Sequence, residues 1–235
     1  MSNMNKPYAA IIDYGMGNLF SVKHACEHAG IESVITSQKA ELLNADAAIL
    51  PGVGAFGDAM NNLKKLDLIE PIKDFISSGR IFMGICLGMQ LLMSETTEFG
   101  IHKGLDIFNG PVIRFPGADS GMRKIKVPQV GWNQIYKFSR SKANSQEDSL
   151  QGGIEDGDFM YFVHSYHAVP SAQELVLSIS YYEGIEYCSS IQYKNIFACQ
   201  FHPERSAHTG LKIYENLAAR LKKITEVGNY GNRAE

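Results

Sequence analysis

The feature that most constrains the fold is an alternation, through the first half of the chain, of short apolar runs with segments of helical periodicity. Apolar side chains recur at helical spacing from Asn18 to Gly30, across residues 56–78 with Pro71 as a candidate break, and over residues 87–94. The runs between them predict buried strands: YAAIID (8–13), SVIT (33–36), AAIL (47–50) and IFMGI (81–85). This alternation is typical of an α/β fold with a mostly parallel sheet and helices on both faces.

The second half predicts strands with few helices between them. Five segments are rich in the Tyr, Phe, Val and Ile that strands prefer: VGWNQIY (130–136), DFMYFVHSY (158–166), ELVLSISYY (174–182), EYCSSIQY (186–193) and NIFACQF (195–201). The polar stretch 138–150 is expected to form a surface loop, and an amphipathic helix from Leu211 to close the fold before a frayed tail at 226–235. We therefore expect a single domain over residues 1–235, a parallel sheet with antiparallel strands added in the second half.

Composition excludes several classes of function. The 235 residues carry a net charge of −3, which lacks the basic excess of nucleic-acid-binding proteins. No apolar run approaches the length that spans a bilayer, and the N-terminus has too short an apolar stretch for a secretory signal, so we expect a cytoplasmic protein that does not bind membranes. The four cysteines form no CxxC pair. Reduced thiols are therefore expected, with no zinc or other metal and no cofactor.

One cysteine lies in an unusual local pattern. The segment MGICLGMQ (83–90) places Cys86 between Gly84 and Gly88, where a predicted strand meets a predicted helix. This is the pattern of a nucleophile elbow, a strained turn that exposes its central side chain. The first amides of the helix would favour the reactive thiolate, and the amide of Leu87 would be placed to bind an oxyanion. The alternative is a buried cysteine in a glycine-rich turn, and the local pattern fits both.

A histidine and a carboxylate occur together at the end of another predicted strand. In CQFHPERS (199–206), His202 leaves the strand and Glu204 follows two residues later. A base that activates a thiol must itself be oriented by a third group, and this spacing lets the carboxylate reach the imidazole. Taken alone, a surface histidine beside a solvated glutamate is the simpler interpretation.

A glycine-rich turn follows the third predicted strand. In PGVGAFGDAM (51–60), Gly52 and Gly54 flank Val53, so the backbone can approach a substrate closely and an amide can donate to an oxyanion. A generic turn is the alternative. The segment is not a phosphate-binding P-loop, because no Gly-Lys-Ser/Thr follows.

Together, PGVGAFGDAM, GICLGMQLL and QFHPERS resemble the class I, or triad-type, glutamine amidotransferases, and the resemblance extends over residues of about 8–224. It implies that a cysteine attacks the side-chain amide of glutamine and releases ammonia, leaving a γ-glutamyl thioester that water hydrolyses. Carried onto this sequence, it implies Cys86 as the nucleophile, His202 as the base and Glu204 as the third member of the triad.

The same resemblance implies roles for other groups. The oxyanion hole would be formed by backbone groups of Gly52, Val53, Gly54 and Leu87. Gln90, one helical turn past Cys86, would bind the α-amino or carboxylate end of glutamine. The rest of that end would be held by Ser165 and Tyr166. The loop 52–54 is expected to change its amide orientation when a partner's ligand is bound, because two glycines make a peptide flip sterically easy.

The acceptor of the ammonia is inferred from further segments. IIDYGMGNLFSV, VPQVGWNQI and GDFMYFVHSYH resemble the members that serve histidine biosynthesis as a heterodimer with a separate cyclase subunit of (βα)₈-barrel fold. Pro128-Gln129 departs from the Pro-His usual in that group, near the expected subunit interface. Relatives that supply ammonia to a sugar in surface-polysaccharide synthesis remain an alternative. A cysteine peptidase is disfavoured by Gln90 and the HPE segment, and a catalytically silent binding module by the complete triad.

Several neighbouring side chains have no single assignment. Trp132 is equally a core residue or, with Asn133, a contact to the cyclase. His164 and His167 are candidates for interface or substrate contact, with His167 expected at the surface. The end of the first strand, where doubly wound sheets gather ligand loops, carries Tyr14, Gly15 and Asn18. By the resemblance, that edge faces the partner.

Overall fold

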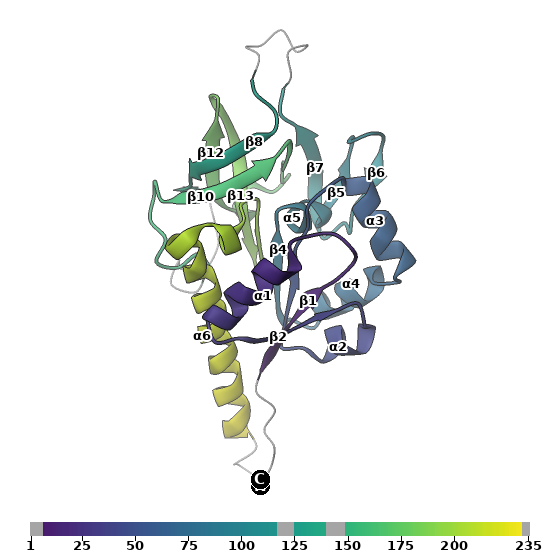
Figure 1. The fold of residues 1–235 in the computed structure, drawn as a ribbon, viewed down its shortest axis with the longest axis vertical. Coiled ribbons are helices and arrows are strands. Elements are labelled where there is room, and N and C mark those ends of the chain that lie inside the picture. Colours follow the sequence, from purple (N-terminus) through teal and green to yellow (C-terminus); the bar gives the residue numbers. More distant parts are fainter. Residues whose placement is uncertain (1–6, 117–124, 140–148, 232–235) are drawn as a thin grey trace.

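A computed structural model describes residues 7–116, 125–139 and 149–231, with side chains as far as residue 224. Its centre is an eight-stranded mixed sheet (Figure 1). Five strands from β2 to β14 run parallel, and the last three join antiparallel. Their spatial order is β2 (Glu32–Thr36), β1 (Tyr8–Ile12), β3 (Ala47–Leu50), β4 (Ile81–Ile85), β14 (Ile196–Cys199), β13 (Ile185–Tyr193), β12 (Val176–Tyr182) and β9 (Tyr136–Lys137). The predicted fold class is confirmed.

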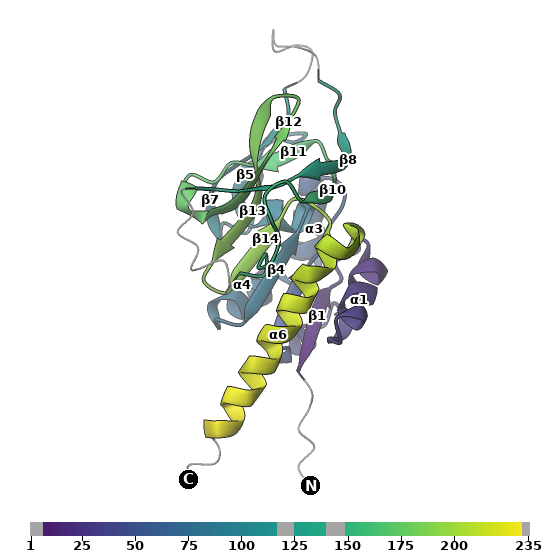
Figure 2. The ribbon, with the colours of Figure 1, turned by 90° about the vertical axis from the view of Figure 1, so that its left-hand side faces the viewer.

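Helices cover both faces of this sheet (Figure 2). One face carries α1 (Leu19–His28) and α6 (Ala207–Gly231), and the other carries α2 (Lys39–Asn44), α3 (Phe56–Lys65), α4 (Ile69–Ser77) and α5 (Leu87–Leu91). The strands are apolar on both sides, so that alternate residues enter different cores. Ile11 and Met83 pack with α1 and α6, whereas Ile12 and Phe82 pack with α3 and α4.

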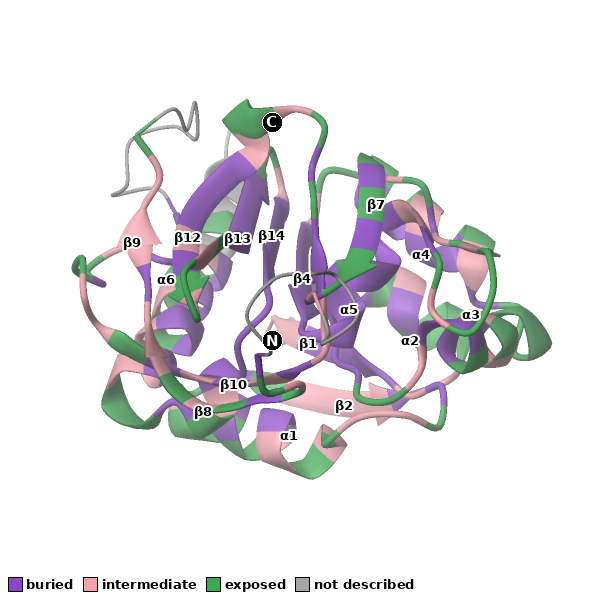
Figure 3. Cartoon of the chain, turned by 90° about the horizontal axis from the view of Figure 1, so that it is seen from above, coloured by how far each residue is buried: buried purple, intermediate pink, exposed green. Residues whose placement is uncertain are grey.

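Two smaller sheets complete the chain. The first is the antiparallel pair β8 (Gln129–Gln134) and β10 (Phe159–His164), which runs on the side of the central sheet that α1 covers (Figure 3). The second joins β11 (Tyr166–Ala168), β7 (Phe108–Arg114), β5 (Met93–Thr96) and β6 (His102–Lys103). Short 3₁₀ turns follow at η3 (Gln173–Leu175) and η4 (Pro203–Arg205).

Two predicted helix boundaries are wrong. The helix after Cys86 ends at Leu91 rather than at residue 94, because the carbonyl of Leu91 accepts the amide of Leu105 at 2.8 Å and the chain enters β5. The region 56–78 breaks around Asp67, which has φ 53°, and not at Pro71. Pro71 lies in the first turn of α4, where a missing N–H removes no helical hydrogen bond.

The structure adds one helix, lengthens another, and leaves some predicted segments outside the described residues. The six-residue helix α2 was not predicted from the sequence. The closing helix continues to Gly231, into the tail expected to fray, and residues 232–235 lie outside the described part. Most of the polar stretch 138–150 also lies outside it, since residues 140–148 are not described. Among the helices that are described, none has the length and apolarity to cross a membrane.

Candidate active site

The turn between β4 and α5 holds Cys86 in a strained conformation. Its φ of 53° and ψ of −107° are rare for an L residue and cost on the order of 1–3 kcal/mol. Gly88 allows the turn to pack against β3, because a Cβ at that position would lie 1.8 Å from the carbonyl oxygen of Leu50. The chain thus forms at Cys86 the strand–helix turn that the sequence pattern predicts. Because α5 has only five residues, its dipole favours a thiolate less than the longer predicted helix would.

His202 and Glu204 emerge beside this turn because β14 is the parallel neighbour of β4 and Cys199 pairs with Ile85. The imidazole Nδ1 lies 2.8 Å from Glu204 Oε1, and the two side chains are 5% and 2% exposed. The backbone amide of His202 donates to the carbonyl of Tyr161 at 2.9 Å, which ties the turn to β10. The structure therefore brings the three predicted triad residues to one edge of the sheet, and the solvated His–Glu pair considered from the sequence is not what forms.

The electrostatics of this pair favour a charged imidazole. Burial lowers the pKa of His202, but the neighbouring Cys86 and Glu204 side chains outweigh burial and raise the pKa to about 10. Nε2 is buried and makes no hydrogen bond to any described group. That nitrogen is therefore available to the thiol and to a leaving group.

The predicted oxyanion groups lie next to one another but do not form an open hole. The amide of Leu87 donates to the carbonyl of Gly52 at 3.4 Å. The Tyr14 hydroxyl, buried beneath the loop, donates to the carbonyl of Pro51 at 2.8 Å. A Cβ on Gly52 would lie 2.2 Å from that hydroxyl, so only glycine fits there. The Leu87 amide, which would donate to an oxyanion, thus donates to the carbonyl of Gly52 instead.

A cavity of about 250 Å³ opens over Cys86 and includes Gln90, Ser165 and Tyr166 in its lining, together with Val53, Gly54 and Leu87. Gln90 is buried, and its Nε2 donates to the carbonyl of Tyr166 at 2.8 Å and to Gln200 Oε1 at 3.0 Å. Both N–H bonds of Gln90 are therefore directed at protein acceptors, which leaves its Oε1 for a ligand. The predicted substrate-binding residues share one cavity with the predicted nucleophile.

The structure gives the burial of three groups of residues whose roles the sequence left open, but not their contact with a partner. Trp132 is 52% exposed, so it is not a core residue, and Asn133 donates to the carbonyl of Tyr181. The expectation that His167 lies at the surface is wrong: it is 4% exposed and packs edge-on against Phe115, because β11 is covered on this side. Of the residues ending the first strand, Tyr14 is buried and Asn18 caps α1 by accepting the amide of Ser21.

Sequence reasoning missed several groups in and around the cavity. Glu98 lines it and accepts the amide of Phe56 at 2.7 Å, and the carbonyl of Val163 lies 3.8 Å from Cys86 Sγ. Gln200, two residues before His202, donates to Cys86 Sγ at 3.5 Å. Side-chain alternation continued from the predicted strand 195–201 was the signal that could have placed Gln200 on the same side as His202. Within the described residues, no cluster of His, Cys, Asp and Glu is arranged to hold a metal ion.

An α/β domain that presents a strained cysteine beside a buried histidine–glutamate pair belongs to the class of thiol-dependent acyl-transfer enzymes. The family model for glutamine amidotransferase class-I matches residues 10–220. The chain therefore belongs to the class-I glutamine amidotransferase family.

Within this family, the chain is similar to relatives that share one name. The imidazole glycerol phosphate synthase subunit HisH of Geobacter sulfurreducens is 45% identical over 208 residues, which cover 88% of this chain and 96% of that protein. The HisH subunit of Aquifex aeolicus is 44% identical over 216 residues, 92% of this chain and 98% of that protein. Among solved structures, PurLQS of Thermotoga maritima superposes with a TM-score of 0.67 at 18% identity, covering 92% of this chain and 99% of that one. The last likeness supports the fold alone.

Proposed function

We propose that the chain hydrolyses glutamine to glutamate and ammonia with Cys86, His202 and Glu204 as its triad. The observation that carries the proposal is the strained Cys86 turn beside a buried His202–Glu204 pair 2.8 Å apart. The Cys86 thiolate attacks the γ-carboxamide carbon. The His202 imidazolium then gives its proton to the departing nitrogen as the C–N bond breaks, which leaves a thioester and ammonia. Water next attacks the thioester, His202 accepts a proton from that water, and glutamate leaves with regeneration of the thiolate.

The cavity fits the amino-acid end of glutamine. Gln90 offers only its Oε1 to a ligand, which suits an α-ammonium group, and Ser165 and Tyr166 lie on the same wall. Glu204 holds Nδ1 and favours the cationic ring, so the proton stays on the face of His202 that serves the leaving group.

The oxyanion site supports a gated activity. A tetrahedral oxyanion needs the Leu87 amide, which the carbonyl of Gly52 now occupies at 3.4 Å. Rotating the Gly52–Val53 peptide would withdraw that carbonyl and turn the Val53 N–H toward the same position. Such a rotation changes ψ of Gly52, which has no Cβ to restrict it. The chain alone is therefore proposed to hydrolyse glutamine slowly.

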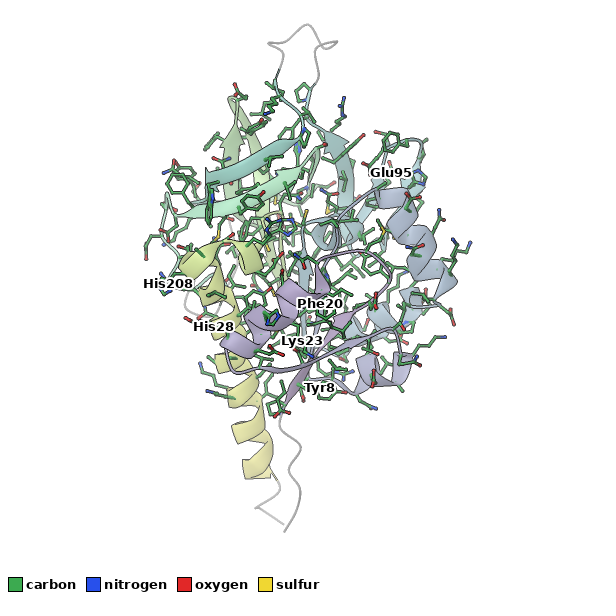
Figure 4. The ribbon with its side chains drawn as sticks, viewed as in Figure 1. Tyr8, Phe20, Lys23, His28, Glu95 and His208 are labelled. Atoms are coloured by element: carbon green, nitrogen blue, oxygen red, sulfur yellow. The ribbon has the colours of Figure 1, made fainter. Side chains whose placement is uncertain are left out.

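A partner would dock on the outward face of the β8–β10 pair. Along β10, the outward residues Phe159, Tyr161 and Val163 alternate with buried ones. They pair with Gln134, Trp132 and Val130 of β8, so this outward face is apolar except at Gln134. Exposed aromatic side chains gathered on one face are typical of an interface. Val163 belongs to this face and also lines the cavity, so a partner docked here would lie next to the released ammonia. Phe20 on α1, below β8 and β10 in Figure 4, is 72% exposed.

The identity of that partner is supported by the relatives, which are named as subunits of imidazole glycerol phosphate synthase. We infer a heterodimer with a cyclase subunit of (βα)₈-barrel fold that uses the ammonia in histidine biosynthesis. Its products would be imidazole glycerol phosphate and aminoimidazole carboxamide ribotide. Cytoplasmic location accords with this role.

The test measures glutamate release by the chain alone, with the barrel subunit, and with the barrel subunit plus its ribotide ligand. Strong stimulation by the liganded partner, absent in Cys86→Ala, is expected. Trp132→Ala should lose most of the stimulation while keeping the unstimulated rate. Cys86-dependent hydrolysis that ignores this partner would reject the histidine assignment and direct the search to a sugar acceptor. No Cys86-dependent hydrolysis under any condition would reject the glutaminase itself.

A further inference from the structure

Gln200 has a buried polar side chain that has no role in the reaction described above. It is the first residue beyond β14, has 0% exposure, and is anchored by its backbone amide, which donates to the carbonyl of Ser189 at 2.9 Å. Its side chain bridges the site: Nε2 lies 3.5 Å from Cys86 Sγ, and Oε1 lies 3.0 Å from Gln90 Nε2. It is thus in direct contact with the reacting sulfur.

The orientation of this amide follows from a group whose polarity is fixed. The carbonyl of Tyr166 can only accept, so the atom of Gln90 that meets it at 2.8 Å is the NH₂ group. The same NH₂ group meets Gln200, whose nearer atom must therefore be its carbonyl oxygen. The NH₂ group of Gln200 is then left to face Cys86 Sγ. A one-way relay of donors runs from the cavity wall to the sulfur.

A donor in this position acts on the charged form of the thiol. Gln200 carries no charge to be compensated, and burial of its amide among protein groups removes competition from water. A hydrogen bond that a thiolate accepts stabilises it relative to the thiol, and the thiolate is the nucleophile. The short helix α5 stabilises a thiolate less than a longer helix would, so a larger share of the stabilisation falls to the Gln200 hydrogen bond.

We infer that Gln200 is a further catalytic residue, which donates a hydrogen bond to the Cys86 thiolate and is held in that orientation by Gln90. The inference rests on the proposed role of Cys86 as nucleophile. It adds a link between substrate recognition and attack, because Gln90 both lines the cavity and orients the donor.

A second buried glutamine provides a matched control. Gln192 on β13 is also buried, and its Nε2 donates to the carbonyls of Lys194 and Ile196 at 3.2 and 3.1 Å. Within the described part of the chain, its side-chain hydrogen bonds involve neither Cys86 nor Gln90, and it does not line the cavity over Cys86. Replacing Gln192 therefore removes a buried amide without touching the relay.

The experiment alkylates the full chain with iodoacetamide from pH 5 to 10 and follows the peptide that contains Cys86 by mass spectrometry. The variants are Gln200→Met, which keeps the side-chain length without a donor, Gln200→Glu, which places a carboxylate opposite the sulfur, and Gln192→Met. Far-ultraviolet circular dichroism monitors folding. The rate at neutral pH is proportional to the thiolate fraction.

Both Gln200 variants should alkylate Cys86 about tenfold more slowly at pH 7, with the midpoint of the pH profile moved to higher pH, while Gln192→Met matches the wild type. Their kcat/KM for glutamine should fall by at least the same factor. An unchanged alkylation profile in a folded Gln200 variant overturns the inference, even if hydrolysis is slower. Failure of the wild-type Cys86 to react faster than a free thiol would instead count against the proposed nucleophile, so the two failures are distinguishable.

Discussion

Two buried histidines lie near Cys86, and their environments differ in one respect that decides their chemistry. His202 and His164 are 4% and 6% exposed, and each uses Nδ1 for a short contact: His202 to Glu204 Oε1 at 2.8 Å and His164 to the carbonyl of Tyr166 at 2.9 Å. Burial lowers the pKa of both. For His164 it prevails, with a small contribution from His167 and His202, and the pKa falls to about 3. For His202 it is outweighed, and the pKa rises to about 10.

The comparison teaches that the charge of the neighbours, and not burial or the number of hydrogen bonds, sets the protonation state. A neutral carbonyl stabilises an imidazolium only modestly, whereas a carboxylate and a thiolate in a poorly solvated site stabilise it strongly. His164 is thus a neutral wall of the cavity, and His202 is a proton carrier. Replacing Cys86, Glu204 or His164 changes this difference directly, whereas replacing Tyr14 changes the loop on the other side of Cys86.

Removing the thiol should have the largest effect. In Cys86→Ala, glutamine hydrolysis should fall by about 10⁴-fold or more, since a covalent route is lost. The pKa of His202 should fall as well, because the main group that raises it is gone. Titration of the imidazole signals by NMR checks this, with His164 as the internal control. A His202 pKa still near 10 would show that Glu204 alone sustains it.

Glu204→Gln should come second. The amide keeps the shape of the side chain but removes the charge, so kcat should fall by about 10²–10⁴-fold. The pKa of His202 should drop from about 10, which moves the alkaline limb of the pH–rate profile to lower pH. The profile of kcat/KM from pH 6 to 10.5 provides the measurement. An alkaline limb that stays where it is would assign it to a group other than His202.

His164→Asn should affect stability more than chemistry. Because the folded-state pKa of His164, about 3, lies below that of an unfolded histidine, about 6.5, the unfolded chain binds more protons between these values. The wild type therefore loses stability as pH falls through this window, and the variant should lose less. Urea unfolding at pH 7.0 and 4.5 compares the two, and glutamine turnover should change by less than about tenfold. Equal losses of stability would contradict a neutral, buried His164.

Tyr14→Phe should have the smallest effect. Tyr14 is buried beneath the loop 52–54, and its hydroxyl donates at 2.8 Å to the carbonyl of Pro51, in the peptide that precedes Gly52. Losing one net hydrogen bond of about 1 kcal/mol should free the loop and raise the unstimulated rate by about fivefold. Tyr8→Phe is the control, because Tyr8 makes the same kind of bond, to the carbonyl of Glu41 at 2.9 Å, far from the site. A slower unstimulated rate in Tyr14→Phe alone would mean that Tyr14 supports the active loop instead.

Much of the fold was accessible from local pattern. β1, β3 and β4 were predicted nearly to their ends because each is a continuous apolar run that is buried along almost its whole length. The edge strand β2 was predicted from the shorter run SVIT, although most of its residues are only partly buried. The candidate triad was assigned through the family resemblance, since the local patterns at Cys86 and at His202 and Glu204 each left a simpler alternative open. The three lie at one edge of the sheet because Cys86 follows β4, and His202 and Glu204 follow its parallel neighbour β14. The end of α5 at Leu91 was not accessible, since carbonyls recruited by a distant segment decided it.

The sequence by itself determined the α/β class, because the period of its apolar residues encodes that class. It also placed Cys86 between two glycines and His202 two residues before Glu204, but it assigned their roles only through the family resemblance. Only the tertiary structure decided that Gln200 faces the sulfur, that the carbonyl of Gly52 occupies the Leu87 amide, and that His164 and His202 titrate at opposite extremes. Each of these depends on which groups from distant segments meet at hydrogen-bond distance in a buried site. The local preferences of the sequence do not encode contacts between distant segments.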